Sequence, residues 1–65
     1  MILTTQQQAQ NFVVFALDRT EELCLVQDKK YIQRDVELVF GTHTFSAATM
    51  QEILDNGFKA WEESY

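Results

Sequence analysis

The last third of the chain carries the clearest periodic pattern of apolar and polar positions. Its apolar residues recur every three or four positions and fall within an arc of about 140° on a helical projection, which defines one face of an amphipathic helix. These residues are Met50, Ile53, Leu54, Phe58, Trp61 and Tyr65. Ser46 stands where an N-cap residue would accept a hydrogen bond from the first turn, with Phe45 and Met50 at the flanking staple positions. We therefore predict one helix over residues 47–63, bent or unbent at Gly57, with a short break into two helical pieces at Gly57 as the open alternative.

The middle of the chain favours a β-hairpin. Residues 23–26 are a short apolar run typical of a buried strand, and residues 28–30 are polar enough for a turn. Residues 31–40 alternate between apolar and polar, and their β-branched side chains and the glycine that follows favour a second strand. A helix also fits this segment. The side chains that would then share one side are Ile32, Val36, Val39 and Phe40.

The N-terminal segment suits a helix better than a strand. Thr4 and Thr5 each precede a glutamine by three residues, which is capping-box spacing, and the glutamine-rich residues 6–10 are good helix formers. A helix would place on one face Ala9, Phe12, Val13, Ala16 and Leu17. Residues 12–15 also suit a strand, in which case residues 18–22 would form a hairpin loop.

These elements together predict an α+β fold for residues 1–65, taken as one small domain. The preferred order is an N-terminal helix, a β-hairpin and a C-terminal amphipathic helix. A three-stranded antiparallel meander with one helix is the second choice, and an all-α chain is the third.

Composition and charge narrow the functional classes. The net charge is −5, which opposes direct binding of nucleic acid and favours a partner with a basic surface. No run approaches the ~20 apolar residues that span a bilayer. Cys24 is the only cysteine, so a disulfide within the chain is excluded and a reducing cytoplasm is favoured. A chain of 65 residues has a small core, which favours support from a second copy and predicts a homodimer.

Candidate catalytic residues are few. Cys24 lies between two leucines with no basic neighbour to activate it, so we expect a small buried apolar residue. His43 is expected in a loop without the orienting partner that an acid or base requires. The acidic pairs have neither the spacing of a calcium loop nor other metal ligands nearby. We therefore expect no catalytic, cofactor or metal site and no small-molecule substrate.

An aromatic stripe at the end of the last helix is the candidate binding site. Tryptophan and tyrosine are enriched among interface anchors, and acidic residues beside them suit a partner groove with a basic rim. The predicted partner-binding residues are Phe58, Trp61, Glu62 and Tyr65. The expected function is that of a non-enzymatic, acidic regulator or inhibitor that occupies a partner protein's surface. The alternative is an acidic nucleic-acid mimic that blocks a DNA-binding protein.

Overall fold

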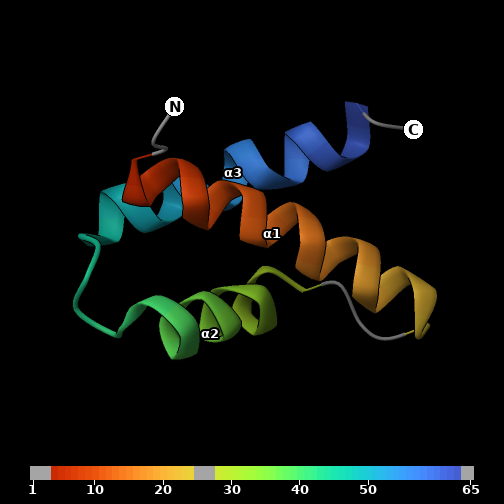
Figure 1. Cartoon of the computed structure of the whole chain (residues 1–65), viewed down its shortest axis with the longest axis horizontal. Helices are drawn as coiled ribbons and strands as arrows, with labels where there is room; N and C mark the ends of the chain where they lie inside the picture. The colour runs from red at the N-terminus through yellow and green to blue at the C-terminus, as the bar shows by residue number, and fades with distance from the viewer. Residues whose placement is uncertain (1–3, 25–27, 64–65) are drawn as a thin grey trace.

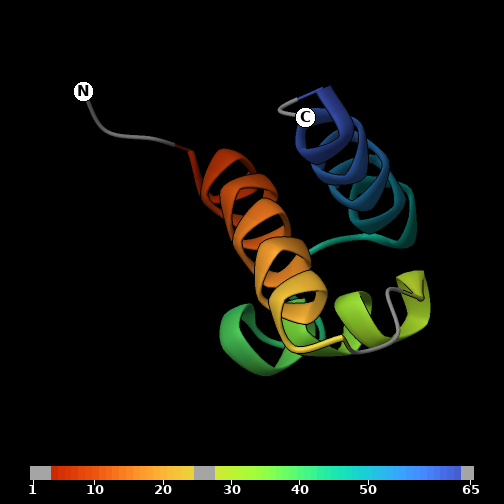
Figure 2. The same cartoon turned by 90° about the vertical axis from the view of Figure 1, so that its right-hand side faces the viewer.

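Three helices make up the part of the chain that the structure describes. The computed structural model describes residues 4–24 and 28–63, in which α1 spans Thr5–Glu22, α2 spans Lys29–Phe40 and α3 spans Ala47–Glu63. Helices α1 and α3 run in the same general direction and cross at an incline, while α2 lies against both and runs the opposite way (Figure 1). A view at right angles shows the three helices arranged around a common interior (Figure 2).

The predicted α+β fold is wrong, because the described residues contain helices and no strand. The β-hairpin and the three-stranded alternative are both overturned, and the third choice, an all-α chain, is the architecture observed. The two outer helices of the prediction are confirmed. The last of them keeps the predicted bounds of 47–63.

Helix α1 begins with the capping box that the threonine–glutamine spacing predicts. The backbone N–H of Gln7 donates to the Thr4 hydroxyl at 3.1 Å, and the backbone N–H of Thr4 donates to the Gln7 side chain at 3.1 Å. Two of the backbone groups that a helix start leaves unpaired are thereby satisfied.

The end of α1 corrects the prediction of a buried strand over residues 23–26. Leu23 and Cys24 terminate α1, and residues 25 and 26 lie outside the described residues. The backbone N–H of Cys24 donates to the Glu21 carbonyl at 3.1 Å, with a φ of 58° in the left-handed region. The Cys24 side chain is exposed, so the expectation of a core cysteine is also wrong. A left-handed residue after the last turn is a common way for a helix to end, and such a position lies at the surface.

Helix α2 occupies the segment for which a strand was predicted. Asp28, expected in a turn, is its N-cap and accepts from the Lys30 backbone N–H at 2.9 Å. Along the helix, the Gln33 amide donates to the Glu37 carboxylate one turn later at 3.0 Å. Ile32 and Val36 are four residues apart and both fully buried, which is the spacing of one helical face turned towards the core.

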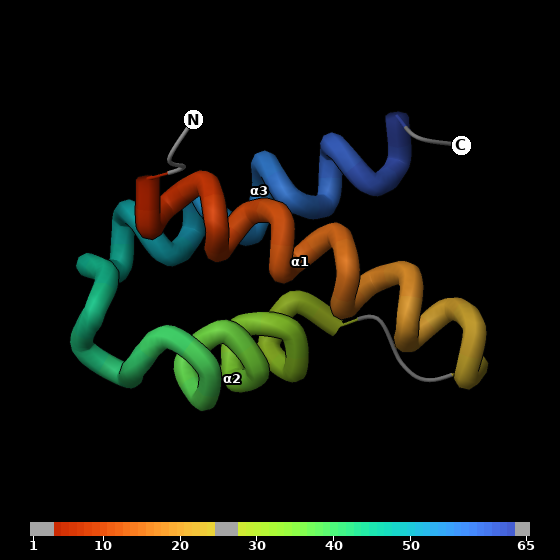
Figure 3. Tube along the Cα trace, viewed as in Figure 1, coloured from red at the N-terminus to blue at the C-terminus, as the bar shows by residue number. Residues whose placement is uncertain are grey.

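Gly41 ends α2 with a backbone geometry that few other residues adopt. Its φ is 108°, and its N–H donates to the Glu37 carbonyl at 2.8 Å. The Thr44 hydroxyl then donates to the carbonyl of Phe40, which closes the turn. The short connection over residues 41–46 carries the chain from α2 into α3 (Figure 3).

Helix α3 begins at the predicted cap and continues through its glycine. The Ser46 hydroxyl accepts from the Thr49 backbone N–H at 3.2 Å. Gly57 is buried in the middle of the helix, where α1 and α3 approach each other. A Cβ built on Gly57 would lie 2.5 Å from Cγ1 and 2.6 Å from Cβ of Val13. The glycine is therefore the residue that lets the two helices pack this closely.

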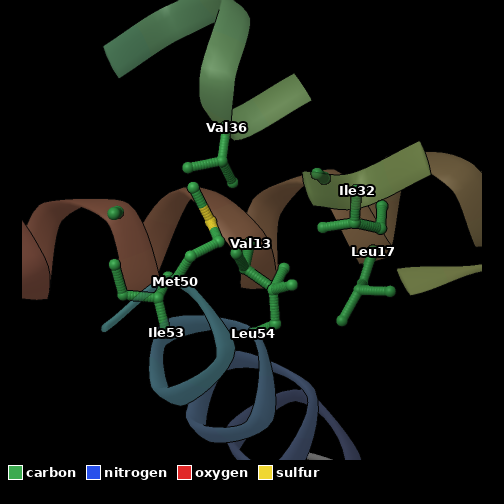
Figure 4. Packing of buried hydrophobic residues seen from close by; sticks show 9 residues of the cluster. Val13, Leu17, Ile32, Val36, Met50, Ile53 and Leu54 are labelled. Carbon is green, nitrogen blue, oxygen red and sulfur yellow. The ribbon is translucent and has the colours of Figure 1, made fainter. Parts of the chain in front are cut away.

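The core draws side chains from all three helices. Figure 4 shows residues of the three elements converging on one apolar interior. The buried apolar residues are Ala9, Val13, Ala16, Leu17, Ile32, Val36, Met50, Ile53 and Leu54. Phe12 packs edge-on against Phe40 at a ring-centre distance of 5.9 Å, and Phe45 packs against the same ring in a tilted arrangement at 6.1 Å. The interior is thus formed by the predicted apolar faces of the two outer helices. The middle segment contributes the face that its helical alternative predicted, except that Val39 is exposed.

Candidate functional site

The two described aromatic residues of the predicted site turn towards different neighbours. Phe58 and Trp61 both pack partly buried against the core. The ring of Phe58 lies beneath the start of α2, with the Lys29 ammonium 5.6 Å from the ring centre. The same ammonium makes an ion pair with Asp55 at 2.8 Å. Phe58 therefore helps to fasten α2 to α3, whereas Trp61 is placed against α1.

Trp61 is held in position across the seam between α1 and α3. Its indole N–H donates to Oδ1 of Asp18 at 2.8 Å, joining residues 43 positions apart. One polar bond at the ring edge and packing beneath it fix the orientation of a side chain that is still partly exposed. An ordered aromatic side chain loses less conformational entropy on binding than a mobile one.

Further acidic residues lie close in sequence to both partners of this bond. Glu21 and Glu22 follow Asp18 by three and four residues, so they share its side of α1. Glu62 follows Trp61 directly and is exposed. We call these five residues, Asp18, Glu21, Glu22, Trp61 and Glu62, the Trp61 site.

The sequence did not indicate the α1 half of the Trp61 site. The predicted residues Phe58, Trp61 and Glu62 are all in α3, and Tyr65 lies outside the described residues. Asp18 is separated from Trp61 by the whole of α2, and only the packing of α1 on α3 brings them together. The sequence signal for this half of the site was weak: Asp18 directly follows Leu17, the last residue of the apolar face of the N-terminal helix.

Most of the large exposed apolar side chains lie elsewhere. They are Phe15, Leu23, Tyr31, Leu38 and Val39, all in α1, at its end or in α2. Leu38 is the most exposed of them at 78%. The strand prediction placed Leu38 on the same face as the buried Ile32, which concealed this surface from the sequence.

Cys24 and His43 do not form a reactive pair in this structure. Cys24 precedes α2, and the exposed His43 follows it in the loop before α3. A helix of 12 residues separates them, which corresponds to about 18 Å. The loop position predicted for His43 is confirmed.

An open cleft of about 310 Å³ runs between α2 and α3. Met50 and Leu54 form its apolar floor, and Lys29, Lys30 and Gln33 form one edge. Neither the cysteine nor the histidine lines it. Across the described ranges, no group of three or more His, Cys, Asp or Glu side chains is placed to hold a metal ion. None of the helices described has both the length and the apolar character to cross a membrane.

Comparisons with protein-family models, curated proteins and solved structures gave no match. The geometry of the chain is therefore the basis for its function. In that geometry Trp61 is an ordered aromatic side chain that is bonded to a carboxylate and remains partly exposed.

Removing the Asp18 side chain should loosen Trp61. We expect Asp18→Ala to shift the tryptophan emission to longer wavelength, because the ring loses its bond at the edge and becomes more hydrated. The loss of stability should be about 1 kcal/mol, typical of one hydrogen bond. Asp18→Asn is the matched control, since it keeps an oxygen acceptor at the same position. Emission and urea unfolding measured on the same samples test this, and an unchanged spectrum in Asp18→Ala would contradict it.

Proposed function

We propose that this protein is a non-enzymatic protein-binding module that acts by occupying a basic surface of a partner protein through the Trp61 site. The observation that carries the proposal is the bond from the Trp61 indole to Asp18, which presents an ordered, partly exposed tryptophan beside a carboxylate. Such a module would regulate or inhibit its partner by covering a surface. We place it in the cytoplasm, in keeping with its single, exposed thiol.

The chemistry of the Trp61 site favours a partner rich in Lys and Arg. A buried aromatic anchor supplies most of the affinity in many interfaces, and surrounding charges increase the association rate and the selectivity. Asp18, Glu21, Glu22 and Glu62 give this site a negative local charge, in agreement with the net charge of −5 for the chain. An arginine side chain is well suited to it, because its plane stacks on an indole while its N–H groups reach a carboxylate.

A charge-reversal experiment tests the site without disturbing the core. Glu21→Lys combined with Glu62→Lys changes one exposed residue of the site on each helix. We expect the double variant to fold normally and to lose at least about tenfold in partner affinity, since attraction at the rim becomes repulsion. The measurement is capture from cell extract on immobilised protein, followed by titration of the purified partner.

Glu52→Lys combined with Gln51→Lys is the control. These residues are also exposed on α3 but lie in its N-terminal half, away from Trp61. A partner that binds the wild type and the control equally, and the Glu62 variant weakly, supports the proposal. Equal binding to all three would place the contact elsewhere.

The structure gives the alternative, a nucleic-acid mimic, no specific support. A mimic requires its carboxylates in a continuous stripe without compensating cations. Here Asp55 is paired with Lys29, and the other acids are distributed over all three helices. We therefore retain the protein-binding module as the proposed function.

A further inference from the structure

The outer side of α2 exposes large apolar side chains away from the core. Tyr31 and Leu38 are seven residues apart, which is two helical turns, so they lie on one line along the helix. Their exposures are 57% and 78%, whereas Ile32 and Val36 on the inner side are fully buried. Val39 borders the same line and is also exposed. We call Tyr31, Arg34, Asp35, Leu38 and Val39 the outer face of α2.

We propose that the outer face of α2 pairs with the same face of a second copy of this chain, with the two α2 helices parallel. An isologous pair brings Tyr31 against Tyr31 and Leu38 against Leu38 across a two-fold axis along the seam. Side chains seven residues apart occupy equivalent positions of successive heptads, so in two parallel helices each meets its own copy across the seam.

The charges between the two apolar residues select the second copy and its direction. Arg34 and Asp35 lie within the turn that separates Tyr31 from Leu38, on opposite sides of the apolar line. Neither side chain forms an ion pair with any residue that the structure describes. In a parallel two-fold pair, each Arg34 lies opposite Asp35 of the other copy on both flanks. In an antiparallel pair, like charges would meet on each flank, which is unfavourable.

The size of the core gives a reason for this association. Only five of the described side chains are both large and fully buried, namely Leu17, Ile32, Ile53, Val13 and Val36. Chains of this length bury a smaller fraction of their apolar surface than larger domains, and a second copy is a usual source of additional burial. Pairing through α2 would cover the most exposed of the large apolar residues.

Sedimentation equilibrium tests the pairing directly. We expect the wild type to move from the 7.6 kDa mass of one chain towards twice that value as its concentration rises. Leu38→Glu should raise the dissociation constant at least about tenfold, since it places two carboxylates in the seam. Ala48→Glu, which adds the same charge at an exposed position of α3, is the matched control and should pair as the wild type does. Circular dichroism checks that every variant is folded.

A charge exchange tests whether the flanking charges contribute to pairing, and a cross-link tests the direction of the helices. In the parallel arrangement, Arg34→Asp sets two carboxylates opposite each other on both flanks and weakens pairing, and the further change Asp35→Arg restores it. The direction is tested by Leu38→Cys in a Cys24→Ser background, because the two residues at position 38 face each other in a parallel pair and form a disulfide between the copies under oxidising conditions, whereas in an antiparallel pair they lie apart. An unaltered dissociation constant in Arg34→Asp, or no cross-link in the Leu38→Cys variant, would overturn the parallel pair.

Self-pairing is independent of the proposed partner binding, because the Trp61 site lies on α1 and α3. A wild type that stays at the mass of one chain at all concentrations, or a Leu38→Glu variant that still pairs, would overturn the pairing and leave the Trp61 proposal standing. Loss of pairing in Leu38→Glu, with pairing retained in Ala48→Glu, would support it.

Discussion

Replacing Gly57 with alanine will lower the free energy of unfolding by about 2 kcal/mol, within the range found for overpacked cores. Helix propensity alone predicts the opposite, a gain of about 1 kcal/mol, because alanine is the better helix former. Packing wins because the new methyl group would lie 2.6 Å from Cβ of Val13. That atom is fixed to the backbone of α1, so no change of side-chain rotamer relieves the contact, and the two helices must move apart.

Asn56→Ala provides the control for Gly57→Ala. Asn56 precedes the glycine in the same helix but is exposed, so only the propensity effect operates, and the variant should be as stable as the wild type or slightly more so. Urea unfolding followed by circular dichroism measures both variants. An increase in stability for Gly57→Ala would show that α1 and α3 do not approach closely at this point.

Ile32→Ala will cost about 3 kcal/mol of stability, in the range found when a large aliphatic side chain is removed from a core. Ile32 is fully buried and is one of the two α2 residues in the core cluster. Total stabilities of about 0.05–0.15 kcal/mol per residue mean that this loss would unfold a substantial fraction of a chain this short. The measurement is again chemical unfolding, carried out at low micromolar protein so that self-pairing contributes little.

Leu38→Ala is the informative comparison for Ile32→Ala. The two residues share a face in the strand interpretation but lie on different sides of α2 in the structure, where Leu38 is exposed. We expect Leu38→Ala to change stability by less than about 0.5 kcal/mol. Equal losses of stability in Ile32→Ala and Leu38→Ala would agree with a strand, in which both side chains share one face, and would contradict the helix.

The two outer helices could be predicted because their signals are local. The capping box at Thr4, the cap at Ser46 and the apolar faces between them depend on residues a few positions apart. Such spacings are determined by the geometry of a single helix. The same reasoning placed the last helix at residues 47–63, with its glycine inside it.

The prediction of a strand over residues 31–40 was wrong because the apolar pattern of this segment fits both the helical period and the strand period. Ile32, Val36 and Phe40 stand on one face of a helix, and they also alternate in a strand. The Asp28 cap was the local signal for a helix, but it was interpreted as part of a turn. The β-branched side chains of this segment favour a strand, but tertiary packing commonly overrides strand propensity. A hairpin without further strands is in addition only marginally stable.

The candidate site was predictable only on the side formed by α3. Trp61 and Glu62 are identified by residue type and position, and both are accessible. Asp18 could not be identified, because its relation to Trp61 depends on how α1 crosses α3. Gly57 presents the same difficulty, since the pattern showed that a glycine was tolerated there but not that Val13 required it.

The contact between the first and last helices also affects the order in which the chain can fold. Asp18 and Trp61 are 43 residues apart, so their meeting requires closure of most of the chain into a loop. Closing a loop of this length has an entropic cost that is recovered only when the distant surfaces pack. Helices α1 and α2 together lack the Met50, Ile53 and Leu54 side chains that complete the interior. Folding should therefore be a single cooperative event in which α3 docks, rather than a stepwise addition of neighbouring helices.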